Sequence, residues 1–199
     1  MNRNKITKAL AGSLLVAASM SAVAKVETFN LNFVTIQDLT ITQVNAIGFA
    51  QNIIGKANTD CTISINATLA AAPTAGAAPA SANVTDGIAG TGCLTVAANA
   101  TNTFAGVYSI VGSANQTVNV TVASATGTDF SFSPSGRLYT SGAAAAAGVD
   151  VFANSAASTT LSGTGGQANL YLGGTITVGS TDLTANTPYS LNFDITAVY

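Results

Sequence analysis

The chain has 199 residues, of which only 6 are Lys or Arg and 8 are Asp or Glu, and it contains no His and no Trp. The absence of His excludes Ser-His-Asp and Cys-His catalysis and every His-bearing metal site. Six basic residues are also too few to neutralise the phosphates of a nucleic acid. We therefore expect no enzyme, no metal, no cofactor and no nucleic-acid partner.

Residues 1–24 have the pattern of a secretory signal peptide. Three basic residues among the first eight precede an apolar run over 9–18, and Ala22 and Ala24 are the small residues that a signal peptidase recognises. The apolar run is shorter than the 20 or so residues of a membrane helix. We expect cleavage before Lys25, export through the periplasm, and no membrane span in the mature chain.

Alternation of apolar and polar residues in the exported part is typical of half-buried β-strands. The clearest case is Thr117–Val122, where Val118, Val120 and Val122 alternate with polar residues. The other alternating segments are, in chain order, 29–33, 39–49, 62–66, 170–178 and 189–199. Because these segments are also rich in β-branched and aromatic residues, we expect an all-β sandwich.

Gly, Pro and Ser between the strands predict loops over 70–82, 124–128, 133–136 and 162–167. The alanine run 143–147 is bracketed by glycines, so it can form one or two helical turns at most. No shift in composition divides residues 25–199. We therefore expect a single domain after the signal peptide.

The two cysteines, Cys61 and Cys93, would meet an oxidising compartment after export. Their separation does not match the C-x-x-C spacing of a redox-active pair. We expect one structural disulfide between them.

The C-terminal part of the chain contains Leu172–Gly179 (LGGTITVG), read as a turn, followed by Thr187–Tyr189 and an alternating terminal strand. These short glycine-aromatic patterns resemble a bacterial family of secreted pilin-like domains of unknown function, which is similar to the spore coat protein U group. Val107–Gly112 together with the strand at 118–122 is similar to the family's central hairpin. Residues 39–49 resemble its first core strand, with Gly48 and Phe49 in reversed order. The resemblance covers most of 38–199.

Such domains are similar to the subunits of chaperone-usher pili, and the resemblance implies both a fold and a mechanism. The fold is an immunoglobulin-like sandwich that lacks its last strand and so exposes a groove. A periplasmic chaperone fills the groove first. At an outer-membrane usher, the N-terminal extension of the next subunit then replaces the chaperone, which is β-strand addition. The implied product is an extracellular fimbrium, a homopolymer that serves adhesion or biofilm formation.

The N-terminal end of the mature sequence fits a strand donor. Residues 25–37 precede the predicted domain at 38–199, and Phe29, Leu31 and Phe33 alternate with polar residues. We expect these three side chains to enter pockets of a neighbouring subunit. The alternative is that this segment pairs as the first strand of its own sheet.

The C-terminal end fits an acceptor. The sequence ends directly after an alternating strand, so we expect no closing strand inside the subunit. The groove residues of this strand are expected to be Tyr189, Leu191, Phe193, Ile195 and Tyr199.

A second hypothesis is a monomeric secreted or tip adhesin that binds host or surface glycans through its loops. A hydrolase is the third, and it would need two acids facing each other across a cleft. The acids occur singly and mostly beside turn residues, as in Asp86-Gly87, and they form no calcium-loop motif.

Overall fold

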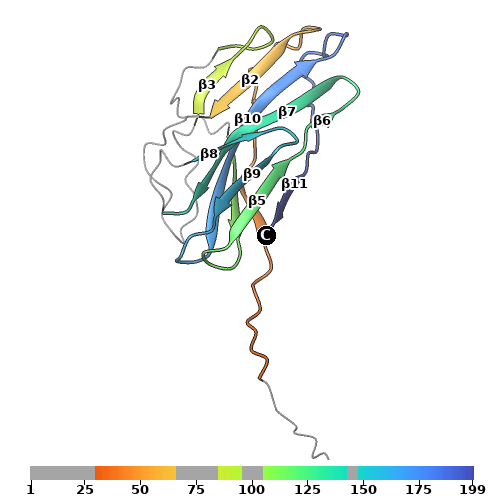
Figure 1. Cartoon of the computed structure of the whole chain (residues 1–199). Helices are drawn as coiled ribbons and strands as arrows, with labels where there is room; N and C mark the ends of the chain where they lie inside the picture. The colour runs from red at the N-terminus through yellow and green to blue at the C-terminus, as the bar shows by residue number, and fades with distance from the viewer. Residues whose placement is uncertain (1–29, 66–84, 96–104, 143–147) are drawn as a thin grey trace, which may run out of the picture. The chain divides into compact units, whose positions relative to one another are not determined.

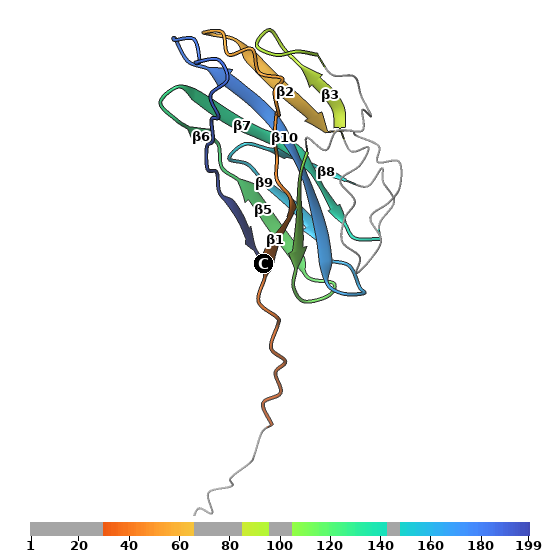
Figure 2. The same ribbon diagram turned by 180° about the vertical axis from the view of Figure 1, so that it is seen from behind.

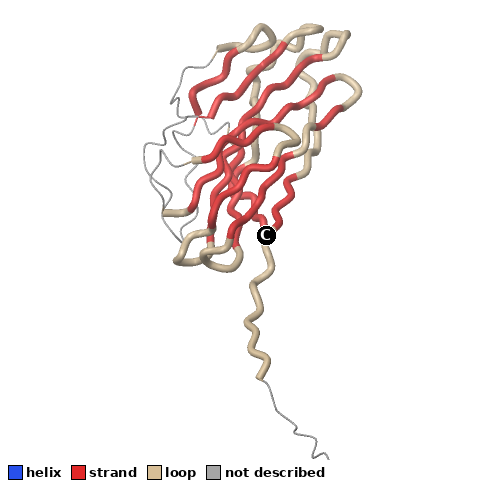
Figure 3. Tube along the Cα trace, in the orientation of Figure 1, coloured by secondary structure: helices blue, strands red, loops and turns tan. Residues whose placement is uncertain are grey.

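A computed structural model describes residues 30–65, 85–95, 105–142 and 148–199. The chain divides into two units, Met1–Val34 and Thr35–Tyr199, and all the described strands lie in the second unit. The predicted signal peptide, the whole of the predicted loop at 70–82 and the alanine run 143–147 fall outside the described residues. Figure 3 shows strands and loops, and no helix, in the described part of the chain.

The second unit is an all-β fold of two antiparallel sheets (Figure 1). Its strands are β1 (Thr40–Asn45), β2 (Asp60–Ile65), β3 (Thr85–Ala89), β4 (Gly106–Val111), β5 (Thr117–Val122), β6 (Ala125–Thr126), β7 (Phe130–Thr140), β8 (Val149–Phe152), β9 (Ala156–Thr160), β10 (Gln167–Val178) and β11 (Ile195–Val198). The prediction of an all-β fold is confirmed, and the two sheets pack as a sandwich.

The long strand β10 organises the larger sheet. One edge of β10 pairs with β7 from Ala168 to Val178. Its other edge pairs first with β4 and then with β2. The outer strands follow from these pairs, since β1 adds to β4, β3 adds to β2, and β6 and β8 add to β7.

The smaller sheet has the order β11-β5-β9 and covers one face of the larger sheet. Val118, Val120 and Val122 of β5 are fully buried, as their alternation predicts. They pack with Leu170 and Leu172 of β10 in the main hydrophobic core. Burial of each such side chain contributes about 1.5 to 3 kcal/mol to the free energy of unfolding.

The segment LGGTITVG is read as a turn in the resemblance, whereas its alternation predicts a strand over 170–178, and the strand is confirmed: Gly173 and Gly174 lie inside β10. A Cβ at either position would collide with a carbonyl oxygen of the neighbouring strand, that of Ile63 or of Ser133. The predicted loop at 133–136 lies inside β7. Its Pro134 pairs with Gly174, and it falls between the stretches of β7 that pair with β6 and β8, where an amide donor is not needed.

The predicted disulfide between Cys61 and Cys93 is present, with their Cα atoms 5.3 Å apart. It joins β2 to the segment after β3, and both residues are buried in a second core cluster that contains Phe49 and Phe132. The bridge fixes the edge of the larger sheet beside the groove described below.

We predict that replacing both Cys61 and Cys93 by Ala lowers the free energy of unfolding by about 3 to 4 kcal/mol. The reason is that the bridge closes a loop between residues 32 positions apart and so reduces the conformational entropy of the unfolded chain. Urea unfolding of the two proteins measures the difference. The unmodified chain unfolded under reducing conditions serves as the control and should match the variant. Equal stability of variant and oxidised protein would contradict the prediction.

Candidate functional site

Two strands on one side of the sandwich each have a free edge among the described residues. β1 pairs only with β4, and β11 pairs only with β5. β1 belongs to the larger sheet and β11 to the smaller one, and both lie near the C-terminus (Figure 2). Free backbone N–H and C=O groups at such edges are a template for adding another strand.

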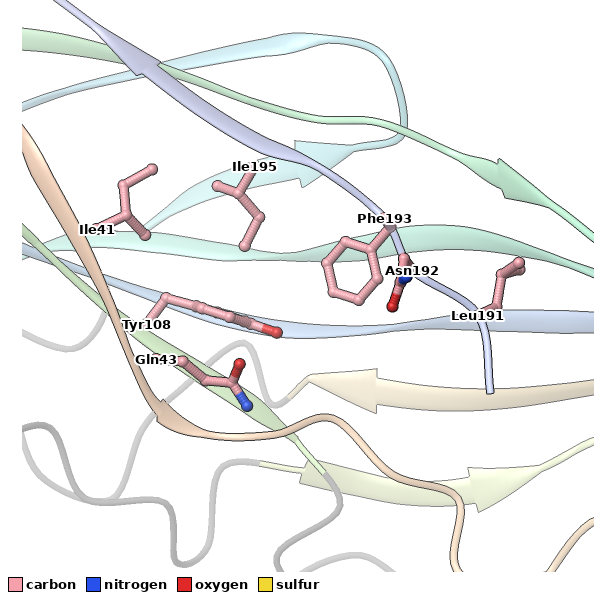
Figure 4. Close-up of a pocket in the computed structure, with 7 residues that line it drawn as sticks. All are labelled: Ile41, Gln43, Tyr108, Leu191, Asn192, Phe193 and Ile195. Atoms are coloured by element: carbon pink, nitrogen blue, oxygen red, sulfur yellow. The ribbon is translucent and has the colours of Figure 1, made fainter. Parts of the chain in front are cut away.

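A cavity of about 390 Å³ separates these two edges. Its lining residues are Ile41, Gln43, Tyr108, Leu191, Asn192, Phe193 and Ile195. Figure 4 shows the residues of β1 and β4 along one side and those of the C-terminal segment along the other. None of them is charged, so the gap suits an apolar, uncharged occupant.

The segment that enters β11 shows the alternation that the sequence predicted. Leu191, Phe193 and Ile195 are half-buried, whereas the residues between them are exposed. The alternation therefore continues well before β11, although only Ile195–Val198 is paired as a strand. The expected strand over 189–199 is thus too long, because no neighbouring backbone pairs with its first part.

A second cavity, of about 900 Å³, adjoins the first and shares Leu191 and Phe193 with it. The predicted groove residue Tyr189 lines this second cavity. Its other large apolar lining residues are Ile47, Phe49, Ile53, Ile54, Phe130, Phe132, Ile176, Leu183 and Leu191. We call the two cavities together the groove.

Residues 184–191 and Phe193 line the second cavity, residues 191–193 line the first, and no backbone–backbone hydrogen bond joins residues 184–193 to another described residue. Hydrogen bonds fix the segment at both ends, from Leu183 N to Gly55 O and from Ala123 N to Asp194 O. The Asp182 carboxylate also accepts from Ala57 N and pairs with Lys56 at 3.1 Å. The Ala57 bond, and then Lys56, lower the pKa of Asp182.

Aromatic side chains that line the groove pack against one another. The rings of Phe193 and Phe132 lie 5.3 Å apart, and those of Tyr189 and Phe130 lie 6.1 Å apart, edge to face. Burial raises the pKa of Tyr108, so its hydroxyl stays protonated at neutral pH. The groove thus has aromatic side chains along its floor, and none of the residues that line its two cavities is Asp, Glu, Lys or Arg.

Tyr199 lies at one end of the groove and lines neither cavity. Its hydroxyl accepts from Ser113 N, at 2.7 Å, and donates to Gln37 O. The tyrosine therefore joins the start of β1 to the end of β11, and its expected part in a groove that accepts a strand stays a prediction.

The predicted donor residues are only partly described. Phe29 lies outside the described residues, and Leu31 and Phe33 are 86% and 77% exposed. Residues 30–33 form no strand, because a strand requires a paired neighbour and no other described residue pairs with them. Their role as a donor stays a prediction.

The sequence reasoning missed the wall opposite β11. Ile41 and Gln43 belong to the alternating segment 39–49, which the sequence predicts as a strand. Alternation alone does not reveal that this strand lies opposite the C-terminal segment. Tyr108, Ile47 and Phe132 reach the groove through sheet pairing of distant segments.

Within the described residues there is no helix that could span a membrane and no cluster of three or more His, Cys, Asp or Glu residues that could hold a metal. Searches against models of protein families, against characterised proteins and against solved structures found no match to this chain.

We predict that Phe193→Ala lowers the free energy of unfolding by about 1 to 3 kcal/mol, because the ring packs against both core clusters. The matched control is Asn192→Ala, since this neighbouring side chain is exposed and its loss should change stability by less than about 0.5 kcal/mol. Urea unfolding measures both. Equal effects of the two substitutions would show that residues 191–195 do not alternate as described.

Proposed function

We propose that this chain is a structural subunit of a bacterial surface fimbrium, and that each copy is completed by a strand from another copy. One observation carries the proposal: the first cavity of the groove, which has no charged side chain and is lined mostly by aliphatic and aromatic side chains, lies between the free edges of β1 and β11. In this proposal the sandwich is immunoglobulin-like and incomplete, and the added strand is its missing one.

A strand in this position satisfies both edges at once. Its backbone bonds to β1 on one side and to β11 on the other, joining the two sheets. Every second side chain points into the groove, where an apolar residue is removed from water. Each fully buried Leu or Phe contributes about 1.5 to 3 kcal/mol before the cost of ordering the segment.

The proposed occupant is residues 25–36 of a second copy. Phe29, Leu31 and Phe33 recur at every second position, the spacing at which side chains reach one face of a strand. Residues 28–37 carry no charge, which matches the uncharged lining of the first cavity. Leu31 and Phe33 are exposed in the single chain and gain burial on insertion.

Donation from one copy to the next joins two different surfaces of the subunit. Such a head-to-tail contact can repeat without closing, so it builds a filament. The purpose we propose for the filament is adhesion or biofilm formation on the cell surface. The resemblance of the C-terminal segment to pilin-like domains supports the same assignment.

Assembly of this kind needs protection of the open groove. An exposed edge beside an apolar surface aggregates unless it is covered, so we propose a periplasmic chaperone and an outer-membrane usher as partners. The disulfide between Cys61 and Cys93 supports export, because such bonds persist in oxidising compartments.

The test compares two substitutions that add the same charge to neighbouring positions of the donor segment. Phe33→Asp places a carboxylate in the groove, and we expect at least a hundredfold loss of polymer, since a buried unpaired charge is strongly unfavourable. Asn32→Asp places it on the outward face and should polymerise normally. Size-exclusion chromatography with light scattering and electron microscopy of the mature chain measure polymer formation.

Deletion of residues 25–36 provides the second arm. We expect the deleted chain to keep the circular dichroism of a folded β protein and to form no filament. Filaments formed by the deleted chain, or equal polymerisation of Phe33→Asp and Asn32→Asp, would contradict the proposal.

A further inference from the structure

Three separate segments meet at the end of the groove where the chain enters β1. Gln37 precedes β1, Ser113 lies in the β4–β5 turn, and Tyr199 follows β11. Gln37 N donates to Ser113 Oγ at 2.5 Å, and Gln37 O accepts from the Tyr199 hydroxyl. That hydroxyl also accepts from Ser113 N. We call this set of three residues the clasp.

The Tyr199 hydroxyl is closely packed within the clasp. Gly112 lies directly beside it, and a Cβ at that position would overlap both the hydroxyl oxygen and the Leu39 side chain. Leu39 and Ala197 pack on the main core at this end of the two strands. The gap between β1 and β11 is therefore filled here, and it opens from Ile41 and Ile195 onward.

The clasp bears on the choice between a chain's own N-terminal segment and that of a second copy. To bring Phe33 into its own groove beside Ile41, the segment must reverse direction between Thr35 and Leu39 and run back beside β1. A tight reversal needs the backbone groups of Gln37 to turn, yet its N–H and its C=O are both bonded. Self-insertion therefore breaks the clasp. A strand from a second copy arrives without this tether and leaves the clasp intact.

We propose that Tyr199 is a specificity-determining residue that holds the chain's own N-terminal segment out of its groove and so selects the strand of a second copy. This inference rests on the proposed function and goes beyond it: it assigns the choice between a self-closed monomer and a polymer to one hydroxyl group. It also gives a role to Tyr199, which was predicted with the groove residues but lines neither cavity.

The experiment uses the full mature chain and three single substitutions. Tyr199→Phe keeps the ring and removes both bonds of the hydroxyl, and Ser113→Ala removes the acceptor of Gln37 N. The matched control is Thr140→Val. It keeps the shape of the side chain and also removes a hydroxyl with two hydrogen bonds, to Thr160 O at 2.7 Å and to Thr159 Oγ1 at 2.9 Å, at a residue that lines neither cavity.

Monomers isolated at high dilution are compared by hydrogen exchange at the amides of β1 and β11, which a self-inserted strand would protect. Because each lost hydrogen bond shifts an equilibrium by roughly fivefold, we expect Tyr199→Phe to raise the protected fraction at least roughly tenfold, with Ser113→Ala in the same direction. Thr140→Val should exchange like the unsubstituted chain. Thermal unfolding followed by circular dichroism verifies that each variant is folded.

Two outcomes would overturn the clasp: unchanged exchange in both Tyr199→Phe and Ser113→Ala, or an unsubstituted monomer that is already protected at high dilution. Failure of the proposed function gives a different result. In that case the unsubstituted chain forms no polymer at any concentration, while the response of β1 and β11 to Tyr199→Phe still supports the clasp.

Discussion

The free edges of β1 and β11 are the constraint on which the rest of this site depends. Backbone N–H and C=O groups need partners when they are covered, and the apolar gap beside these edges gains free energy when water leaves it. One added strand meets both needs at the same place. The lack of charge in the lining, the aromatic floor and the alternating residues 191–197 are all consistent with that one occupant. No side-chain chemistry is required, in keeping with a chain that has no His and few charges.

β10 indirectly fixes the wall of the groove that β1 and β4 form, and the disulfide-bonded edge of the sheet beside the second cavity. β10 pairs with β4, which supplies Tyr108 and carries β1, and its later part pairs with β2, which the disulfide ties to Cys93. The close approach of β2 and β7 to β10 depends on Gly173 and Gly174, where the neighbouring carbonyl oxygens leave no space for a side chain. The two adjacent glycines of LGGTITVG are thus required for the packing of β10 between its neighbouring strands.

Local patterns in the sequence predicted what depends on local geometry. The valines of β5 and the half-buried residues 191–195 face inward as their alternation indicates, and the cysteines pair. The sequence did not reveal which strands become neighbours. Pro134 indicates a loop by itself, yet it is accommodated in β7 because that edge is unpaired there. The alternation of Leu191, Phe193 and Ile195 predicts that Tyr199 also faces inward. Its hydroxyl instead forms hydrogen bonds with Gln37 and Ser113, which are distant in the chain.

The most direct test of the account is cross-linking within the assembled protein, with isotopically labelled and unlabelled copies mixed before assembly. A photoreactive residue in place of Phe33 should react with the groove, at Ile41 or at residues 191–195, and the products should join labelled to unlabelled chains. That result would place the N-terminal segment of one copy in the groove of another. Cross-links confined to single chains, or no reaction with the groove, would contradict strand addition between copies.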